Sequence, residues 1–314
     1  MNKILLTMLV ALLAGCASAP PPRLDNSLSA RSQSSRVKFI VIHYTVSDLP
    51  RSIKILTEQE VSSHYLLTDE AEPKFYTLVD EARMSNHAGV SSWKTYANLN
   101  PMSVGIEIVN PGFKQTPEGR VWYPFPQAQL DQLIPLLKQI VARHNIPPQN
   151  ILGHSDIAPQ RKQDPGPLFP WHQLAAAGLI TWPDAGQVAA QRALFESQVP
   201  DVAWFQKKLA QHGYAVPQTG VLDDATRNVM FAFQSKYRPA RFDGNPDAES
   251  AAILEVLAPS PKPAPLAPAP AMGVQAPVPA VPAMPQAQPA QPALPAAPAL
   301  PPVPVQPTES QATP

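Results

Sequence analysis

Two histidines and one aspartate stand where a fold could bring them together. His43 ends the apolar, β-branched run VKFIVIH (37–43), and His154 ends a second short apolar run, ILGH (151–154). Ten residues after His154, Asp164 is followed by Pro-Gly-Pro, which restricts the backbone. Two imidazoles and one carboxylate are a common ligand set for a catalytic zinc ion, with a fourth position left for water. We therefore treat these three residues as candidate zinc ligands.

A carboxylate and a lysine extend this set. Glu107 lies in SVGIEIV (103–109), on the opposite face from the apolar side chains, and Gly105 leaves space on the same face as Glu107. A carboxylate there can take a proton from a zinc-activated water and pass it to a leaving amine. Lys162 lies two residues before Asp164, where its ammonium can stabilise the oxyanion of a tetrahedral intermediate. From the residues alone, the alternative of solvated loop charges and core histidines stays open.

Strand and helix patterns are intermixed around these residues, which predicts an α/β fold. The further strand candidates are SSHYLLT, KFYTLV and SVGIEIV, and the first two flank the acidic turn DEAEP and so predict a hairpin. PQAQLDQLIPLLKQIVARHN has a helical apolar stripe, which is interrupted by Pro135 and ended by Pro147 and Pro148. We expect a catalytic α/β domain at residues 36–180.

A smaller helical unit follows this domain. DAGQVAAQRALFESQ predicts a helical connector within residues 181–198. Between residues 199 and 257, three segments have helical apolar spacing: VAWFQKKLAQHGY, a helix that begins near Asp223, and DGNPDAESAAILEVL. Three helices in about 60 residues predict a small three-helix bundle domain.

The N-terminus has the features of a secretory signal. A lysine is followed by an apolar run (4–13) and small residues, a pattern too short for a spanning helix. LAGC (13–16) resembles a bacterial lipobox, in which Cys16 is lipidated and becomes the first mature residue; the alternative is plain cleavage near Ala19. Acyl chains on Cys16 would fix the protein to a membrane. Ala17 at the next position favours the outer membrane.

The two ends of the chain differ in composition from the region between them. We expect a signal peptide at residues 1–15 and a lipidated tether at 16–35, which is rich in Pro, Ser, Ala and Arg. Residues 258–314 are about one third proline with few charges, which predicts a disordered Pro/Ala-rich tail. A permissive spacer is the favoured role of this tail, and docking to a partner is the alternative. The expected location is the periplasmic face of the bacterial outer membrane.

Charge and cysteine content exclude several classes of protein. The chain has 24 Lys and Arg against 24 Asp and Glu, so no basic excess points to nucleic acid. Cys16 is the only cysteine of the 314 residues. An internal disulfide is therefore excluded, and a metal site must use His, Asp and Glu.

The motifs taken together resemble one family. FIVIHYT, SSHYLL, NHAG, SVGIEIVN and GHSDIAPQRKQDPGP follow the order of the zinc-dependent N-acetylmuramoyl-L-alanine amidases of the type-2 amidase family, over roughly residues 36–172. The resemblance implies a mixed central sheet flanked by helices, as in peptidoglycan recognition proteins. It also implies hydrolysis of the amide bond between N-acetylmuramic acid and L-alanine of peptidoglycan stem peptides. Residues 199–257 resemble a peptidoglycan-binding module of three helices, and lipid-anchored periplasmic members of the family have the same order of parts.

The resemblance assigns roles residue by residue. The zinc ligands of the family fall on His43, His154 and Asp164, and Asp164 stands where some relatives have cysteine. The catalytic glutamate falls on Glu107, and the lysine of the final loop falls on Lys162. Because all three ligand positions hold competent residues, the resemblance implies an active enzyme.

Three more positions are candidate substrate contacts. His87, in NHAG, resembles the substrate-cleft loop of the family, and Asn110 ends the strand of the catalytic carboxylate. His64, in SSHYLL, is expected beside the site, mainly as a structural residue. Asp156 lies only two residues after His154, and the family pattern places it outside the metal shell.

Two other functions fit parts of the pattern. One is a non-catalytic peptidoglycan receptor that uses both domains for binding, and the other is a zinc endopeptidase that cuts peptide cross-links. The complete ligand set and Glu107 favour an enzyme, and the order of the motifs favours the amidase. The expected partners are one Zn²⁺, the muropeptides of peptidoglycan and a membrane through the lipid on Cys16, with no nucleic acid and no identifiable protein partner.

Overall fold

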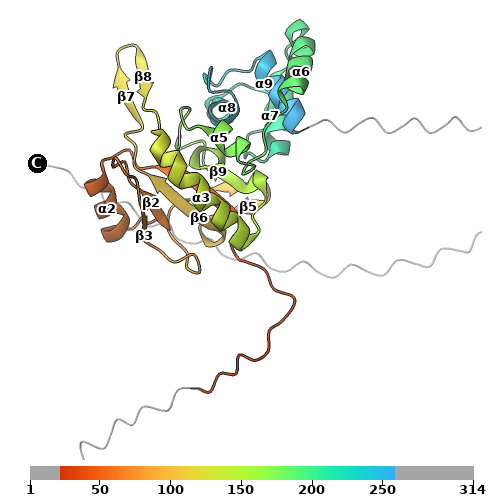
Figure 1. Cartoon of the computed structure of the whole chain (residues 1–314). Helices are drawn as coiled ribbons and strands as arrows, with labels where there is room; N and C mark the ends of the chain where they lie inside the picture. Colours follow the sequence, from red (N-terminus) through yellow and green to blue (C-terminus); the bar gives the residue numbers. More distant parts are fainter. Residues whose placement is uncertain (1–21, 259–314) are drawn as a thin grey trace, which may run out of the picture. The chain divides into compact units, whose positions relative to one another are not determined.

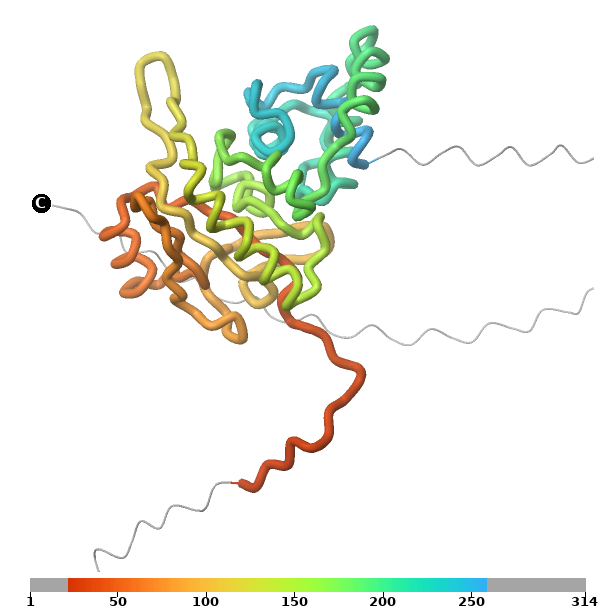
Figure 2. Tube along the Cα trace, in the orientation of Figure 1, coloured from red at the N-terminus to blue at the C-terminus, as the bar shows by residue number. Residues whose placement is uncertain are grey.

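The computed structural model of the chain describes residues 22–258 (Figures 1 and 2). The signal segment, Cys16 and the Pro/Ala-rich tail lie outside the described residues, so their predictions stay open. The described part of the tether, residues 22–35, contains no helix or strand. Within residues 22–258, no helix combines the length and the apolar composition that crossing a membrane requires.

A five-stranded sheet lies at the centre of the first region, in the order β3-β2-β6-β1-β9. Strands β2, β6, β1 and β9 are parallel, and β3 pairs antiparallel with β2 as the predicted hairpin requires. Neighbouring parallel strands end at the same edge of a sheet, so residues at their carboxyl ends come together. The strands are β1 (Phe39–Tyr44), β2 (Tyr65–Leu67), β3 (Phe75–Thr77), β6 (Ser103–Ile108) and β9 (Ile151–Gly153).

The two faces of the sheet are covered by different parts of the chain. Ile40 and Ile42 of β1 pack on the side of helix α3 (Gln127–His144), which runs through Pro135. Phe39 of β1 points to the other face, where it belongs to a cluster with the C-terminal helices. Both faces are buried, which explains why the predicted strands are apolar almost throughout.

The C-terminal helices form what we call the helical module, residues 185–257. Its helices are α6 (Ala185–Ser197), α7 (Val202–His212), α8 (Asp224–Tyr237) and α9 (Ala248–Leu257), and α6 packs along α9. Each begins after an aspartate whose side chain accepts a hydrogen bond from a backbone N–H of the first turn. These capping residues are Asp184, Asp201, Asp223 and Asp247. The helices predicted from the sequence are confirmed.

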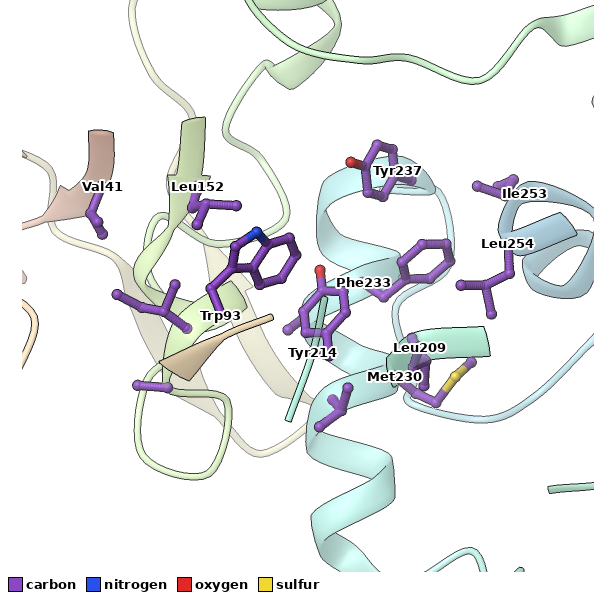
Figure 3. Packing of buried hydrophobic residues seen from close by; sticks show 14 of the residues in the cluster. Val41, Trp93, Leu152, Leu209, Tyr214, Met230, Phe233, Tyr237, Ile253 and Leu254 are labelled. Carbon is purple, nitrogen blue, oxygen red and sulfur yellow. The ribbon is translucent and has the colours of Figure 1, made fainter. Parts of the chain in front are cut away.

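The helical module and the sheet share one apolar cluster, shown in Figure 3. Val41 and Leu152 come from the central sheet, and Trp93 comes from the short strand β4 (Ser92–Trp93). The indole of Trp93 lies edge-on to the ring of Tyr214, with 5.0 Å between the ring centres. The module residues labelled in Figure 3 are Leu209, Tyr214, Met230, Phe233, Tyr237, Ile253 and Leu254. The module therefore serves as the cover of one face of the sheet.

Several short elements were not predicted from the sequence. Helix α2 (Leu49–Glu58) is capped by Asp48, whose carboxylate accepts from Arg51 N. The others are β4 (Ser92–Trp93), β5 (Tyr96–Ala97), η1 (Asn100–Met102), β7 (Phe113–Thr116), β8 (Gly119–Trp122), η2 (Pro148–Asn150), α4 (His154–Ile157) and α5 (Trp171–Ala176). The two hairpins, β4–β5 and β7–β8, stand apart from the central sheet.

Arg36 joins the tether to the body of the protein. Its guanidinium donates hydrogen bonds to the backbone carbonyls of Pro101 and of three consecutive residues, 81–83. One residue earlier, the hydroxyl of Ser35 lies 2.7 Å from Nδ1 of His144 at the end of α3. The chain is thus attached at several points just before β1 begins.

Candidate active site

The three candidate metal ligands meet at the carboxyl ends of two neighbouring strands. His43 is near the end of β1, and His154 follows β9 directly as the first residue of α4. Asp164 comes back to this point because its carbonyl accepts a hydrogen bond from Ser155 N at 2.8 Å. Nδ1 of His43, Nδ1 of His154 and Oδ2 of Asp164 form a triangle with sides of 2.9, 3.1 and 3.1 Å, and all three residues are buried.

The hydrogen bonds of His154 determine which ring nitrogen carries the proton. Nε2 of His154 lies 3.2 Å from the carbonyl oxygen of Ala88, which can only accept. Nη2 of Arg161 is farther from this nitrogen, at 3.4 Å, and already donates to carbonyls of the same loop. Nε2 of His154 therefore carries the hydrogen, and Nδ1 presents a lone pair to the centre of the triangle.

The same reasoning assigns the proton of His43 through a chain of two further residues. Ser103 Oγ donates to Leu99 O at 2.7 Å, so it accepts from Nε2–H of His87 at 3.0 Å. Nδ1 of His87 is then an acceptor, and Nε2–H of His43 donates to it at 2.9 Å. Nδ1 of His43 is left with a lone pair that points at the other two ligand atoms.

Three acceptor atoms facing one another at these distances fit a cation. Two imidazole lone pairs and a carboxylate oxygen repel each other, since no hydrogen stands between them in these tautomers. In a tetrahedral zinc site, bonds of about 2.0–2.1 Å place ligand atoms about 3.3 Å apart, close to the observed separations. The outer nitrogens of both histidines donate to fixed acceptors, an arrangement common behind metal ligands. The residues therefore fit a divalent metal ion of the zinc type.

The electrostatics of the ligands agree with this protonation. Burial, followed by the nearby His154, lowers the pKa of His43 to about 4, so its ring is neutral at pH 7. The pKa of His87 is also lowered, chiefly by burial, as its place in the hydrogen-bond chain requires. The rings of His43 and His87 are thus neutral, as the hydrogen-bond chain behind the ligand requires.

Glu107 lies beside the ligands because β6 is paired with β1. His43 and Glu107 are register partners in the two parallel strands. The carboxyl group is half-buried, and its Oε2 atom has no hydrogen-bond partner among residues 22–258. Burial, and next the negative charge of Asp164, raises the pKa of Glu107 to about 8, while Lys162 opposes the shift. An unpartnered carboxyl group with a raised pKa is suited to exchanging protons in the cleft.

The site opens into a cavity of about 560 Å³. The candidate ligands and Glu107 line this cavity, and so does the exposed Lys162. Arg161 also lines the cavity, next to His154, and donates to the carbonyls of Ala88 and Val90. The structure thus brings together all five residues that the sequence analysis assigned to catalysis and metal binding.

The three expected substrate contacts have different positions. His87 lines the cavity, but its two ring nitrogens are used by His43 and Ser103. His64 is buried; its Nδ1 accepts from Gly105 N, and its Nε2 donates to a backbone carbonyl. Asn110 is buried and bonds to backbone atoms at 112 and 124. His64 thus has the structural role that the sequence analysis favoured, and Asn110 also bonds to the backbone; contact of these three residues with substrate stays a prediction.

The sequence analysis noted the space at Gly105 without foreseeing that the His87 ring fills it, and it missed the role of Ser103. A Cβ atom on Gly105 would lie 2.4 Å from the ring of His87, so only glycine leaves room for that ring. A glycine inside a strand signals a close approach of this kind, and that signal was available. Ser103 ends the hydrogen-bond chain behind His43, and nothing in its sequence context pointed to that role.

Comparison with known proteins places this geometry in a family. Residues 33–167 match the N-acetylmuramoyl-L-alanine amidase family, and residues 198–254 match a peptidoglycan binding domain. The N-acetylmuramoyl-L-alanine amidase AmiD of Escherichia coli (strain K12) is 42% identical over 258 residues, which cover 78% of this chain and 93% of AmiD. The chain belongs to the N-acetylmuramoyl-L-alanine amidase family.

Solved structures agree with this membership. The complex of the amidase AmiD from E. coli with anhydro-N-acetylmuramic acid-L-Ala-D-γ-Glu-L-Lys has a TM-score of 0.68, and the alignment covers 74% of this chain and 93% of that one. The crystal structure of AmpDh3 from Pseudomonas aeruginosa is 35% identical with a TM-score of 0.69, over 76% and 98% of the two chains. The mixed sheet with flanking helices that the resemblance implied is confirmed, and in both structures the match extends over nearly the whole relative.

Proposed function

We propose that this amidase family member hydrolyses the amide bond between N-acetylmuramic acid and L-alanine of peptidoglycan stem peptides, with one zinc ion held by His43, His154 and Asp164. The observation that carries the proposal is the convergence of three lone pairs beside an unpartnered carboxyl group at the edge of one cavity. The E. coli amidase solved with an anhydromuramyl tripeptide supports the substrate class.

The protein supplies the proton transfers and the charge stabilisation. A zinc ion, when bound, polarises a substrate carbonyl and lowers the pKa of a water molecule. The carboxylate form of Glu107 is favoured by any cation held at the three ligand atoms, because an opposite charge lowers the pKa of a carboxyl group. Glu107 then takes a proton from the attacking water and delivers it to the nitrogen of the leaving L-alanine. The Lys162 ammonium stabilises the negative oxygen that develops on the lactyl carbonyl.

The experiment is digestion of purified peptidoglycan with the full chain, followed by mass spectrometry of the soluble products. Free stem peptides that begin at L-alanine are expected. They should disappear when the metal is removed with a chelator, return when zinc is added back, and be lost in Glu107→Gln. Glu118→Gln, at the exposed turn between β7 and β8, is the matched control and should leave the products unchanged.

Two other outcomes would replace the proposal. Cleaved peptide cross-links with intact muramyl-alanine bonds would identify a zinc endopeptidase. Binding to peptidoglycan without any product would identify a receptor. The E. coli amidase that matches 93% of its length to this chain favours the amidase over both.

We further infer a periplasmic enzyme that is anchored in the outer membrane through a lipid on Cys16 and that binds the polymer with its helical module. The lipobox supports the anchor, and the match of residues 198–254 to a peptidoglycan binding domain supports polymer binding. Labelled palmitate should enter the wild-type chain and sediment with outer membranes, whereas Cys16→Ser should take up no label and stay soluble. Label retained in Cys16→Ser would refute the anchor.

A further inference from the structure

The loop of residues 154–164 carries two candidate zinc ligands and Lys162. It is held from outside by the helical module, which contacts it at Asp156 and at Gln160. We propose that the module is a positioning element of the active site, beyond any role in binding the polymer. This inference rests on the proposed function, because it concerns the same reaction.

Asp156 is the first point of contact. Its side chain is 1% exposed, and its Oδ2 atom accepts from Gly153 N at 2.8 Å, which closes the turn that begins at His154. The remaining contacts of the carboxylate come from the module. Tyr214 OH donates to Oδ1 at 2.5 Å, and Lys236 Nζ lies 2.8 Å from Oδ2. One carboxylate therefore joins the turn of a metal ligand to two residues of the module.

Lys236 of α8 reaches deep into the catalytic region. Its side chain is 4% exposed, and its ammonium also donates to Ile151 O in β9 at 3.1 Å. The same ammonium lies 4.3 Å from the centre of the Trp171 ring. A buried ammonium requires such partners, because its charge is costly away from water. All these partners belong to the catalytic region, and two of them flank His154.

Gln160 is the second point of contact. Its Nε2 atom donates to Ala225 O at 2.9 Å, and Asn228 Nδ2 donates to its Oε1 atom at 3.0 Å. Both groups of Gln160 are thus bonded to α8, two residues before Lys162. Gln160 and Asn228 also line the cavity of the active site. The module thus holds the loop at two points, Asp156 and Gln160, both of which precede Arg161 and Lys162.

The apolar cluster that the module shares with the sheet fixes the position of the module beside the loop. The module packs on the sheet face that carries Phe39 and Val41, and His43 follows them on the same side of β1. The ligands and the contacts to the module therefore lie on one face of the sheet. A module that only tethered the enzyme to its polymer would need none of these buried polar contacts.

The test compares the full-length wild type with Lys236→Met on two substrates. These are the soluble anhydro-N-acetylmuramic acid-L-Ala-D-γ-Glu-L-Lys and insoluble peptidoglycan. Lys236 does not line the active-site cavity. Lys236→Met should lower kcat on the soluble substrate by about 10-fold to 100-fold, because small displacements of reacting groups are that costly. Its KM and its binding to insoluble peptidoglycan should stay within about twofold of wild type.

Two further variants separate positioning from folding. Lys207→Met, on the exposed side of α7, is the matched control and should behave as wild type. Tyr214→Phe removes only the hydroxyl that bonds to Asp156, so it decides the question if Lys236→Met does not fold. It should lower kcat severalfold with an unchanged circular dichroism spectrum. The apo forms of Lys236→Met and Tyr214→Phe should also bind zinc more weakly than wild type in competition with a chelating dye, as His154 loses its fixed position.

The results that would overturn the proposal are distinct. Wild-type kcat and zinc affinity in folded Lys236→Met and Tyr214→Phe would refute positioning, as would a loss confined to the insoluble polymer. If the proposed amidase function is wrong, the outcome differs from these results. In that case the wild type itself releases no peptide from either substrate, while the zinc affinities of the variants still report whether the module positions the loop.

Discussion

Asp156 and Asp164 lie eight residues apart in one loop, and both are buried. Asp164 faces two neutral imidazoles whose lone pairs point at its Oδ2 atom. Asp156 faces an ammonium and a phenol hydroxyl, which donate to both of its oxygens. One carboxylate has its hydrogen-bond donors in place, and the other is surrounded by acceptors that only a cation can bring together.

This difference shows how a metal ligand can be recognised without a metal. The sequence GHSDIAPQRKQDPGP makes the two aspartates look alike, since each is a short acidic side chain among turn formers. The donors around each carboxylate distinguish them. A carboxylate whose neighbours are all acceptors has a deficit of positive charge, and a carboxylate with a buried lysine does not.

The most severe test of this comparison replaces each aspartate in turn. Asp164→Ala should lose bound zinc and reduce peptide release to background, because two imidazoles alone hold the ion poorly. Asp156→Ala should retain bound zinc, although more weakly than wild type because the turn of His154 loses its support, and should lose about 3–5 kcal/mol of folding stability, since Lys236 is left buried without its partner. Zinc content after gel filtration and urea unfolding measure the two effects. Loss of zinc from both variants would break the distinction.

The next largest effect is expected at Glu107, whose carboxyl group lies beside the ligand Asp164. Glu107→Gln keeps the size of the side chain but removes its ability to exchange a proton. It should lower kcat by about 10²–10⁴-fold and leave zinc content unchanged. Single-turnover rates with a soluble muropeptide measure this effect, and a variant with near wild-type kcat would assign the proton transfer to another group.

The hydrogen bond from His43 to His87 tests how far a residue behind a ligand contributes to zinc binding. His87→Ala removes the acceptor of His43 Nε2–H and should weaken zinc binding by about 10–100-fold. His87→Gln can still accept at this position, so it should recover part of the affinity. His172→Ala, at an exposed position of α5, serves as the control. If His87→Ala and His172→Ala bind zinc equally well, the chain has no influence on the ligand.

The smallest effect concerns His212 of the helical module and is a loss of folding stability at acidic pH. Burial, followed by the charge of Lys236, lowers the pKa of His212 to about 4. The unfolded chain takes up a proton near pH 6.5 and the folded chain does not, so stability is lost as the pH falls from about 6.5 to about 4. The contribution is at most about 3 kcal/mol. Urea midpoints at pH 7 and pH 4.5 should differ less in His212→Phe than in wild type, and equal differences would show that another group causes the loss.

Much of the framework follows from local sequence. The apolar run that ends at His43, the hairpin of β2 and β3, and the module helices with aspartate caps are confirmed, because their signals lie within a few neighbouring residues. The extra hairpins were missed because β4, β5, β7 and β8 are only two to four residues long. Strands β2 and β3 are equally short, but they lie in apolar runs that flank an acidic turn, and no comparable pattern marks the extra hairpins.

The site was predictable to a different extent. The ligands, Glu107 and Lys162 could be proposed because motif order restricted which residues could meet. The roles of Asp156, Gln160 and His87 could not be predicted, because each depends on a partner far away in the chain. Lys236 lies 80 residues after Asp156, and no local pattern in α8 indicates that this lysine points inward. Side-chain contacts between separate units arise only after both have folded.

The attachment of Arg36 has a mechanical consequence. A pull on residues 22–35 meets the guanidinium and its backbone acceptors at 81–83 and Pro101 before it reaches the first residue of β1. The force is thus distributed over the two segments of the catalytic region that carry these acceptors. His43, seven residues further along, is thereby shielded from tension that would otherwise run along its own strand.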